Sequence, residues 1–426
     1  MKIILLLALI QTYSLFAIEP QASLLLWDIN SKIANLDSCP HIHSKNKSTT
    51  IISAPTTEGS MKDFYIYKTS VMPSELSRKF PSISTYSGIG VKDASERLSI
   101  TRGAKKITAM ILSNDGNTFI TQMNNEDVFK VSRFEEDANN NIFNSCNPIN
   151  NNILHRKTDF PNCIGEESPC YLMGNELVTY RLAVIMTESV TNTKADGSVE
   201  GGMTWLASMV NQLNLLWLRE LSFQLELIAN NDILIFTDSN PSPKGEDGFG
   251  ETNCSNSDPK YCEINNVEPY LDTVIGVGGF DAPDDQRIWE YGMVLNTTYN
   301  GGLAQAPGPI SASNPDYEVI NHELGHNLGS AHNITIEDGY RCSLGGTIMG
   351  SRTRTSSSNF GDQYSIHTIE IAFNNLNTLP LDNTYGDSYA YLKGYSRTQT
   401  NNVVPSLNVP ESGLTIPKET PFVLEG

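Results

Sequence analysis

The feature that most constrains this chain is a short histidine-rich segment. Residues 321–332 read Asn-His-Glu-Leu-Gly-His-Asn-Leu-Gly-Ser-Ala-His. On a helix, His322 and His326 lie four positions apart, so both imidazoles project from one face and can share a metal ion. Gly329 follows three residues later, where a residue without Cβ allows the chain to leave the helix through a left-handed turn. That turn can bring His332 back as a third nitrogen ligand.

Three neutral imidazoles with one open position describe a catalytic zinc site, because a structural site is normally closed by four protein ligands. Glu323 follows the first histidine, and its carboxylate can reach a water in the open position without binding the metal. Zinc lowers the pKa of such a water to about 7, while the carboxylate takes and returns the proton. A polar helix with fortuitous histidines is the bland alternative, but this spacing arises by chance only about once in 10⁴ chains of this length.

Length and charge limit the remaining possibilities. The chain has 426 residues and a formal net charge of −19. A length above that of one ordinary domain predicts two or three folded units. The acidic balance argues against a nucleic-acid partner, because such a surface releases no counterions from phosphates. No internal stretch approaches membrane-spanning length, so we expect no membrane span.

The N-terminus has the features of an export signal. Lys2 precedes an apolar run from Ile3 to Leu9 that fades toward Ala17. This order is typical of a secretory signal peptide, which we place at residues 1–17. We therefore expect the protein to be secreted, and an oxidising destination allows disulfides to close short loops. Two pairs of cysteines have suitable spacing: Cys163 with Cys170, and Cys254 with Cys262.

Composition separates the N-terminal part of the chain from a linker. Residues 18–137 mix short alternating segments with turn signals and predict a β-rich domain. Its strands are expected at residues 64–67, 98–101, 107–112 and 119–123. Residues 138–176 are rich in Asn, which favours a linker, and the dibasic pair Arg156-Lys157 is a candidate processing site. An ordinary solvated loop is an equal alternative.

The C-terminal part differs from the N-terminal part in its pattern of apolar residues. The apolar run from Leu177 to Met186 is typical of a strand buried on both faces. Residues 201–219 carry apolar side chains at the three- and four-residue spacing of an amphipathic helix. Strands are expected again at residues 221–227 and 233–236. This order predicts an α/β sheet with right-handed crossovers. Residues 380–426 are rich in Asn, Ser, Thr and Pro and predict a loose tail, which could begin a further β module.

A second motif leads to a family resemblance. Met349, in Thr347-Ile348-Met349-Gly350, stands seventeen residues after His332. The extended zinc motif followed by such a Met-turn resembles the metzincin metallopeptidases. HELGHNLGSAH, with Cys342 ahead of the Met-turn, resembles their reprolysin (adamalysin) family. The resemblance implies a catalytic α/β (α+β) domain at residues 177–379, with a mixed, mostly parallel twisted sheet and an active-site helix, preceded by a β-rich propeptide domain.

The resemblance also implies roles for other residues. Met349 would lie beneath the zinc ligands as an apolar floor, although taken alone it would more often be plain core. Ser351 and Arg352, just past the Met-turn, would line the main specificity pocket. The upper rim of the cleft, where a substrate peptide pairs as an added strand, would be formed by Gly301, Gly302, Leu303 and Ala304. The chain departs from the reprolysin pattern at Asn333, where the family usually has Asp.

Seven cysteines leave at least one sulfur without an intrachain partner. Metzincin zymogens often hold a propeptide thiolate on the zinc, so the resemblance makes Cys146 a candidate cysteine switch, with the propeptide as an intramolecular inhibitor. The alternative is that Cys146 is disulfide-bonded or free and does not block the zinc. Three other cysteines could take the same role: Cys39, Cys163 and Cys170. His41 and His43 could form a separate ligand pair, although exposed histidines near a domain start are commoner.

The sequence therefore predicts a secreted, zymogen-like zinc endopeptidase that hydrolyses peptide bonds of extracellular polypeptides. One catalytic Zn²⁺ is expected on His322, His326 and His332, with Glu323 as general base, and the sequence does not itself indicate a structural Ca²⁺ site. A competing prediction is an exported binding or adhesion protein that uses a protease-like domain as a scaffold. A zinc hydrolase of non-peptide substrates is disfavoured by the resemblance alone.

Overall fold

The structure is a computed structural model. It describes residues 22–113, 116–123, 127–133, 146–148, 176–241, 293–298, 310–313, 317–328, 334–337, 340–343, 348–349, 369, 372 and 395–400. The predicted signal peptide, most of the predicted linker and most of the predicted tail lie outside the described residues. None of the helices in these ranges has the length and apolar composition needed to cross a bilayer.

The largest sheet has eight strands, and every neighbouring pair in it is antiparallel. Its order is β1-β8-β7-β6-β5-β4-β3-β2. The strands are β1 Ala22–Leu26, β2 Ile51–Pro55, β3 Met61–Thr69, β4 Ser84–Gly90, β5 Arg97–Arg102, β6 Ile107–Leu112, β7 Thr118–Gln122 and β8 Val128–Arg133. The four strands expected from alternation in this region are confirmed as β3, β5, β6 and β7.

The two faces of this sheet differ in chemistry because side chains alternate along each strand. One face carries an apolar cluster that includes Phe64, Ile100 and Phe129, closed by Trp27 and Leu36. Both residues come from the segment between β1 and β2, which also contains the short helices η1 Asn30–Lys32 and α1 Ile33–Leu36. The opposite face is rich in buried hydroxyl side chains: Thr85, Ser87, Ser99 and Thr101.

A second sheet has five strands and mixed directions. Its order is β11-β10-β12-β13, with β16 also paired to β10. The pairs β10–β11, β10–β12 and β12–β13 are parallel, and β10–β16 is antiparallel. The bounds are β10 Glu176–Met186, β11 Phe223–Leu227, β12 Met293–Thr298, β13 Ile310–Ser313 and β16 Tyr395–Gln399.

The remaining elements are short except for one helix. The helices are α2 Ser74–Lys79, α3 Glu188–Lys194, α4 Val199–Glu220, η3 Asn231–Leu234 and α6 Tyr317–Asn327. A small third sheet has the order β14-β15-β9, with β14 Ile334–Glu337, β15 Tyr340–Ser343 and β9 Cys146–Pro148. The expected strand at residues 233–236 is wrong at its start, because a 3₁₀ turn occupies Asn231–Leu234 and only Ile235 forms an isolated bridge.

The prediction of a fold defined by a mixed, mostly parallel twisted sheet is also wrong. The dominant element among the described residues is the eight-stranded antiparallel sheet, and the mixed sheet is the smaller one. The physical reason is the length of chain that each kind of strand connection needs. Antiparallel strands are joined by short turns, whereas parallel strands need long crossovers, so the described N-terminal residues place more strands in one sheet than the described residues of the motif-bearing part do.

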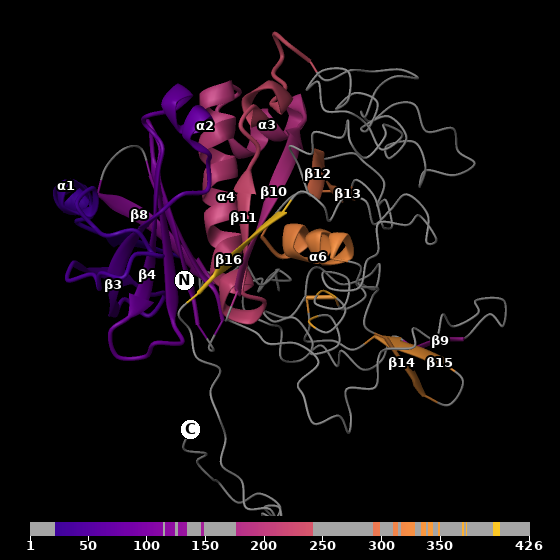
Figure 1. Ribbon diagram of the computed structural model, residues 1–426, viewed down its shortest axis with the longest axis horizontal. Helices are drawn as coiled ribbons and strands as arrows, with labels where there is room; N and C mark the ends of the chain where they lie inside the picture. Colours follow the sequence, from indigo (N-terminus) through magenta and orange to yellow (C-terminus); the bar gives the residue numbers. More distant parts are fainter. Residues whose placement is uncertain are drawn as a thin grey trace, which may run out of the picture.

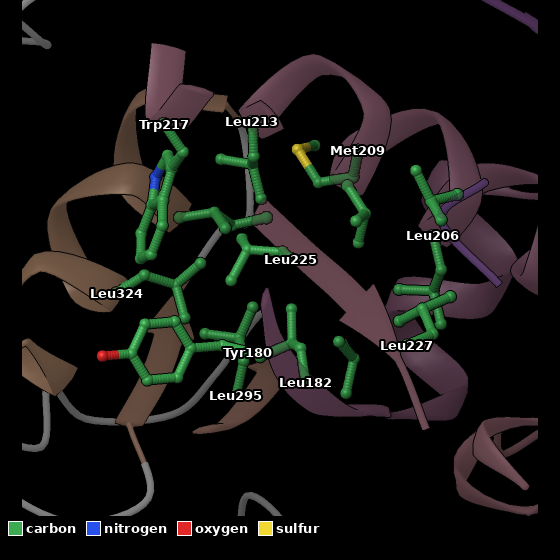
Figure 2. Close-up of a cluster of buried hydrophobic side chains, with 14 of the residues drawn as sticks. Tyr180, Leu182, Leu206, Met209, Leu213, Trp217, Leu225, Leu227, Leu295 and Leu324 are labelled. Atoms are coloured by element: carbon green, nitrogen blue, oxygen red, sulfur yellow. The ribbon is translucent and has the colours of Figure 1, made fainter. Parts of the chain in front are cut away.

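Helix α4 lies between the two sheets (Figure 1). Ser198 precedes its first residue, Val199, and caps the helix, because Ser198 Oγ accepts a hydrogen bond from the Gly201 N–H at 3.0 Å. One side packs on β11, where its apolar residues meet those of the mixed sheet (Figure 2). The other side packs on β4, β5 and β6 through polar residues. Asn211 donates from Nδ2 to the carbonyls of Tyr86 and Ile100, both at 3.1 Å.

The free edge of β11 is covered by parts of the molecule that are not strands. The Leu225 N–H donates to Asn214 Oδ1 at 2.7 Å, and Asn214 Nδ2 donates to the Leu225 carbonyl at 2.9 Å. Two residues further, the Leu227 N–H donates to the carbonyl of Val71 at 2.9 Å. Because an uncovered strand edge invites unwanted pairing, the amide of Asn214 takes the place of a neighbouring strand.

The N-terminal sheet and the mixed sheet share one apolar core. Six residues of the N-terminal part belong to the same cluster as β10, β11 and α4: Val71, Met72, Leu76, Ile83, Met110 and Leu112. Two ion pairs border this contact, Lys79 with Asp232 at 2.8 Å and Lys105 with Asp196. The N-terminal sheet is therefore a structural neighbour of the motif-bearing part.

Candidate metal centre

Helix α6 carries the first part of the histidine motif. Its residues Val319, Ile320 and Leu324 are buried in the shared core, together with Leu328 just after the helix. This apolar face fixes α6 against α4 and the β12–β13 end of the mixed sheet (Figure 1). His322 is only 4% exposed. The motif thus begins inside the protein, on a helix held by its apolar side.

The ring of His322 is oriented by a backbone carbonyl from the Met-turn segment. Its Nδ1 lies 2.6 Å from the carbonyl oxygen of Ile348. A carbonyl can only accept a hydrogen bond, so Nδ1 carries the proton and Nε2 of the neutral ring keeps its lone pair. Metal-binding histidines commonly have this outer partner, because it sets both the tautomer and the ring orientation. The donor chemistry of His322 therefore fits a zinc ligand.

Met349 lies directly after that carbonyl. Both Ile348 and Met349 are buried, and both belong to the apolar cluster that contains Leu324 and Leu328. Burial of this pair holds the Met-turn segment beside α6, which allows the Ile348 carbonyl to reach His322. The position agrees with an apolar support for the candidate metal centre, and it is equally that of a core methionine.

Glu323 is also nearly fully buried, at 4% exposure. A carboxylate taken out of water is costly unless it has polar or metal partners. Glu323 follows His322 on α6, so the general base predicted from the sequence lies at the start of the candidate metal centre. His326 belongs to the same helix one turn later, but its side chain lies outside the described part.

A buried polar contact ties α6 to α4 one residue before the first histidine. Trp217 Nε1 donates to Asn321 Oδ1 at 3.0 Å, and Asn321 Nδ2 donates to the Tyr317 carbonyl at 3.2 Å. The ring of Tyr317 also meets Phe119 of β7 edge-on, with centroids 5.9 Å apart. Sequence reasoning missed this contact. The available signals were an Asn within an otherwise apolar helix face and a Trp ending the apolar stripe of α4.

Several predicted site residues cannot be placed. His332, Ser351 and Arg352 lie outside the described residues, as does the predicted cleft rim, Gly301 to Ala304. Cys146 falls in β9, where its register partner is Cys342 of β15. This pairing leaves the disulfide alternative for Cys146 open beside the cysteine switch.

The described residues provide no third metal ligand beside the pair His41 and His43. The rings of His41 and His43 lie 5.4 Å apart, and His43 Nε2 lies 2.7 Å from Gln224 Oε1 of β11. Burial, followed by the charges of His43 and Lys68, lowers the pKa of His41. Among the described side chains, no group of three or more His, Cys, Asp or Glu could hold a metal ion. This pair acts as a contact between the N-terminal part and β11.

Comparison with known proteins adds one distant likeness. No protein-family model matches the sequence, and no curated protein is significantly similar to it. Among solved structures, a metalloproteinase-II from Bacteroides fragilis is similar with a TM-score of 0.39 and 11% identity, over 82% of this chain and 95% of that chain. At this level of similarity, the basis for a functional proposal is the motif and the geometry around His322.

Proposed function

We propose that this chain is a zinc-dependent endopeptidase. The observation that carries the proposal is the hydrogen bond between His322 Nδ1 and the Ile348 carbonyl, which prepares Nε2 for a metal on the helix that also bears Glu323 and His326. A buried core histidine also needs a partner for its ring N–H, so the spacing of His322, His326 and His332 is what distinguishes a zinc ligand from such a histidine. The proposal includes three zinc ligands, His322, His326 and His332.

Glu323 acts as general base and then as general acid. It accepts a proton from the water that attacks the scissile carbonyl, and later delivers that proton to the nitrogen of the leaving amine. When bound, zinc supplies Lewis acidity toward the carbonyl and lowers the pKa of water to about 7. The burial of Glu323 keeps bulk water away and so strengthens its electrostatic interactions. Met349 supports the ligand helix from its apolar side.

The finer assignment is a secreted enzyme of reprolysin type, made as a latent precursor. It rests on the motif from His322 to His332, on the Met-turn and on the signal-like residues 1–17. The substrate would be an extracellular polypeptide, bound as an added strand along Gly301 to Ala304, with Ser351 and Arg352 near the specificity pocket. The N-terminal part, which packs on α4 and touches Tyr317, would act together with the linker as the intramolecular inhibitor, and would stay packed on α4 after the linker is cut.

The test compares the full chain with Glu323→Gln for zinc content and cleavage of a mixed peptide library. Each protein is assayed before and after limited proteolysis within residues 138–176. We expect one zinc per chain in both, cleavage only with Glu323, and higher activity after the linker is cut. Glu318→Gln, on the same helix, is the matched control and should keep full activity. Zinc binding without hydrolysis in any form would favour the binding-scaffold prediction, and absence of zinc would overturn the proposal.

A further inference from the structure

The contact between Trp217 and Asn321 joins the long central helix to the ligand-bearing helix at the level of the metal site. The two side chains are fully buried, and their hydrogen bond spans 104 residues of sequence between α4 and α6. Asn321 uses its second polar group within α6, on the Tyr317 carbonyl. We call this pair the Trp217–Asn321 link.

Apolar packing alone does not set the rotation of α6 about its axis. Ile320, Leu324 and Leu328 bury the helix against the core, but such contacts depend on area and not on direction. A hydrogen bond is directional and weakens steeply when its angle departs from linearity. Inside a protein, a satisfied polar pair also favours one arrangement over others, because breaking it leaves two buried groups unpaired. The link therefore selects one rotation of α6.

That rotation decides where the metal ligands point. Side-chain atoms of a helix lie about 6 Å from its axis, so a rotation of about 20° would displace a ligand atom by about 2 Å. Metal–ligand distances tolerate only about 0.2 Å. The Ile348 carbonyl orients the ring of His322 from the Met-turn side, whereas the link holds the backbone of the preceding residue from the α4 side. One constraint acts on the ring of His322, and the other acts on the adjacent residue of the helix that bears His322.

We propose that Trp217 and Asn321 are positioning residues that hold the ligands of α6 in the geometry that zinc requires. This inference rests on the proposed function, because it presupposes that His322 binds zinc. Neither residue touches the metal or a substrate. They act through the helix, so their loss should weaken zinc binding in a chain that is still folded.

The experiment measures the dissociation constant for Zn²⁺ in the full chain, by competition with a chromophoric chelator. Trp217→Phe removes the N–H donor and keeps an aromatic ring, and Asn321→Leu removes both polar groups at similar volume. We expect each variant to bind zinc about 10- to 100-fold more weakly, the range found when an outer partner of a ligand is lost. The double variant should lose no more than either single variant, because the pair acts as a unit.

Asn211→Leu is the matched control. Asn211 lies on the same helix, is equally buried and bonds to the N-terminal sheet, so this variant should lose thermal stability with less than about a threefold change in zinc affinity. The proposal is overturned if folded Trp217→Phe binds zinc as tightly as wild type, or if Asn211→Leu weakens zinc equally. Should Asn321→Leu fail to fold, Trp217→Phe still decides. A wild-type chain that binds no zinc would refute the proposed function instead.

Discussion

The ring of His322 is oriented by a main-chain atom, and a main-chain atom is present whatever the residue type at that position. Its outer partner is the main-chain oxygen of residue 348, which every amino acid possesses. The Ile348 side chain contributes only by burial, which holds the turn in place. Substitutions of Ile348 should therefore preserve the orientation of His322 when the new side chain is apolar and similar in volume.

Asn214 is the residue whose loss should affect the fold most clearly. Its amide satisfies both the N–H and the carbonyl of Leu225, so Asn214→Leu leaves two buried backbone groups without partners. We expect destabilisation by about 2 kcal/mol or more, measured by urea unfolding at an unchanged m value. Asn35→Leu, at an exposed position of α1, should change stability by less than about 0.5 kcal/mol. Equal stabilities for the two variants would contradict this role.

Asp196 gives a pH-dependent prediction. Hydrogen bonds from the Lys105 ammonium and then the Ser198 hydroxyl lower its pKa from 3.8 to about 2. A lowered carboxyl pKa stabilises the folded state above the unfolded value, and this contribution is lost as pH falls from about 4 to about 2. Asp196→Asn should therefore lower Tm by a few degrees near pH 7 and have no effect near pH 2. Since Asp196 is one-third exposed, solvent limits the size of the effect.

Lys105→Met is the companion variant for this ion pair. It should lower Tm near pH 7 by less than Asp196→Asn does, because Ser198 still donates to Asp196, and the double variant should lose little more than Asp196→Asn alone. A Tm difference that persists unchanged near pH 2 would show that the Asp196 side chain acts through packing and not through its charge.

At the scale of elements, alternation and periodicity predicted several of the strands and the long helix, but not what these elements pair with. Strands β3, β6 and β10 and helix α4 lie where the pattern places them. Their partners depend on turns and crossovers, which apolar spacing does not record, so the eight-stranded sheet was not foreseen. The same holds for the site. Spacing predicted His322 and Glu323 as site residues, whereas the Trp217–Asn321 link joins residues far apart in sequence, which spacing does not reveal.

The register of the third sheet predicts a disulfide. Cys146 of β9 is directly opposite Cys342 of β15 in an antiparallel pair. Opposed residues in such pairs have Cα atoms about 4.5–5.5 Å apart, within the range of about 4.4–6.8 Å that a disulfide spans. Among the described side chains, Cys39 is a free, buried thiol.

Peptide mapping of the oxidised chain without reduction tests this pairing. We expect one cross-linked peptide that contains Cys146 and Cys342, and alkylation of Cys39 only after denaturation. Cleavage within residues 149–175 should then leave the two pieces covalently joined until a reductant is added. Alkylation of Cys146 in the unreduced chain would contradict the prediction and favour the cysteine switch.

At the scale of the whole molecule, the two large sheets depend on one core. The N-terminal part contributes Val71, Leu76 and Met110 to the cluster that surrounds α4 and β11. A chain of residues 176–426 alone would expose these contacts and the polar face of α4. We expect it to show helical far-ultraviolet dichroism without a near-ultraviolet signal or a cooperative melt. Adding residues 18–137 as a separate chain should restore both, and a sharp melt of the shorter chain alone would refute this dependence.

The position of α4 between the two sheets determines how its amide hydrogens exchange with solvent. Amide hydrogens in the middle of α4, around Asn211 and Leu213, are shielded on both sides. Opening either sheet alone still leaves the helix covered by the other. Deuterium should therefore enter this helix only when the entire chain unfolds, so that its exchange rate reports the global free energy, while short helices such as α2 exchange through local opening.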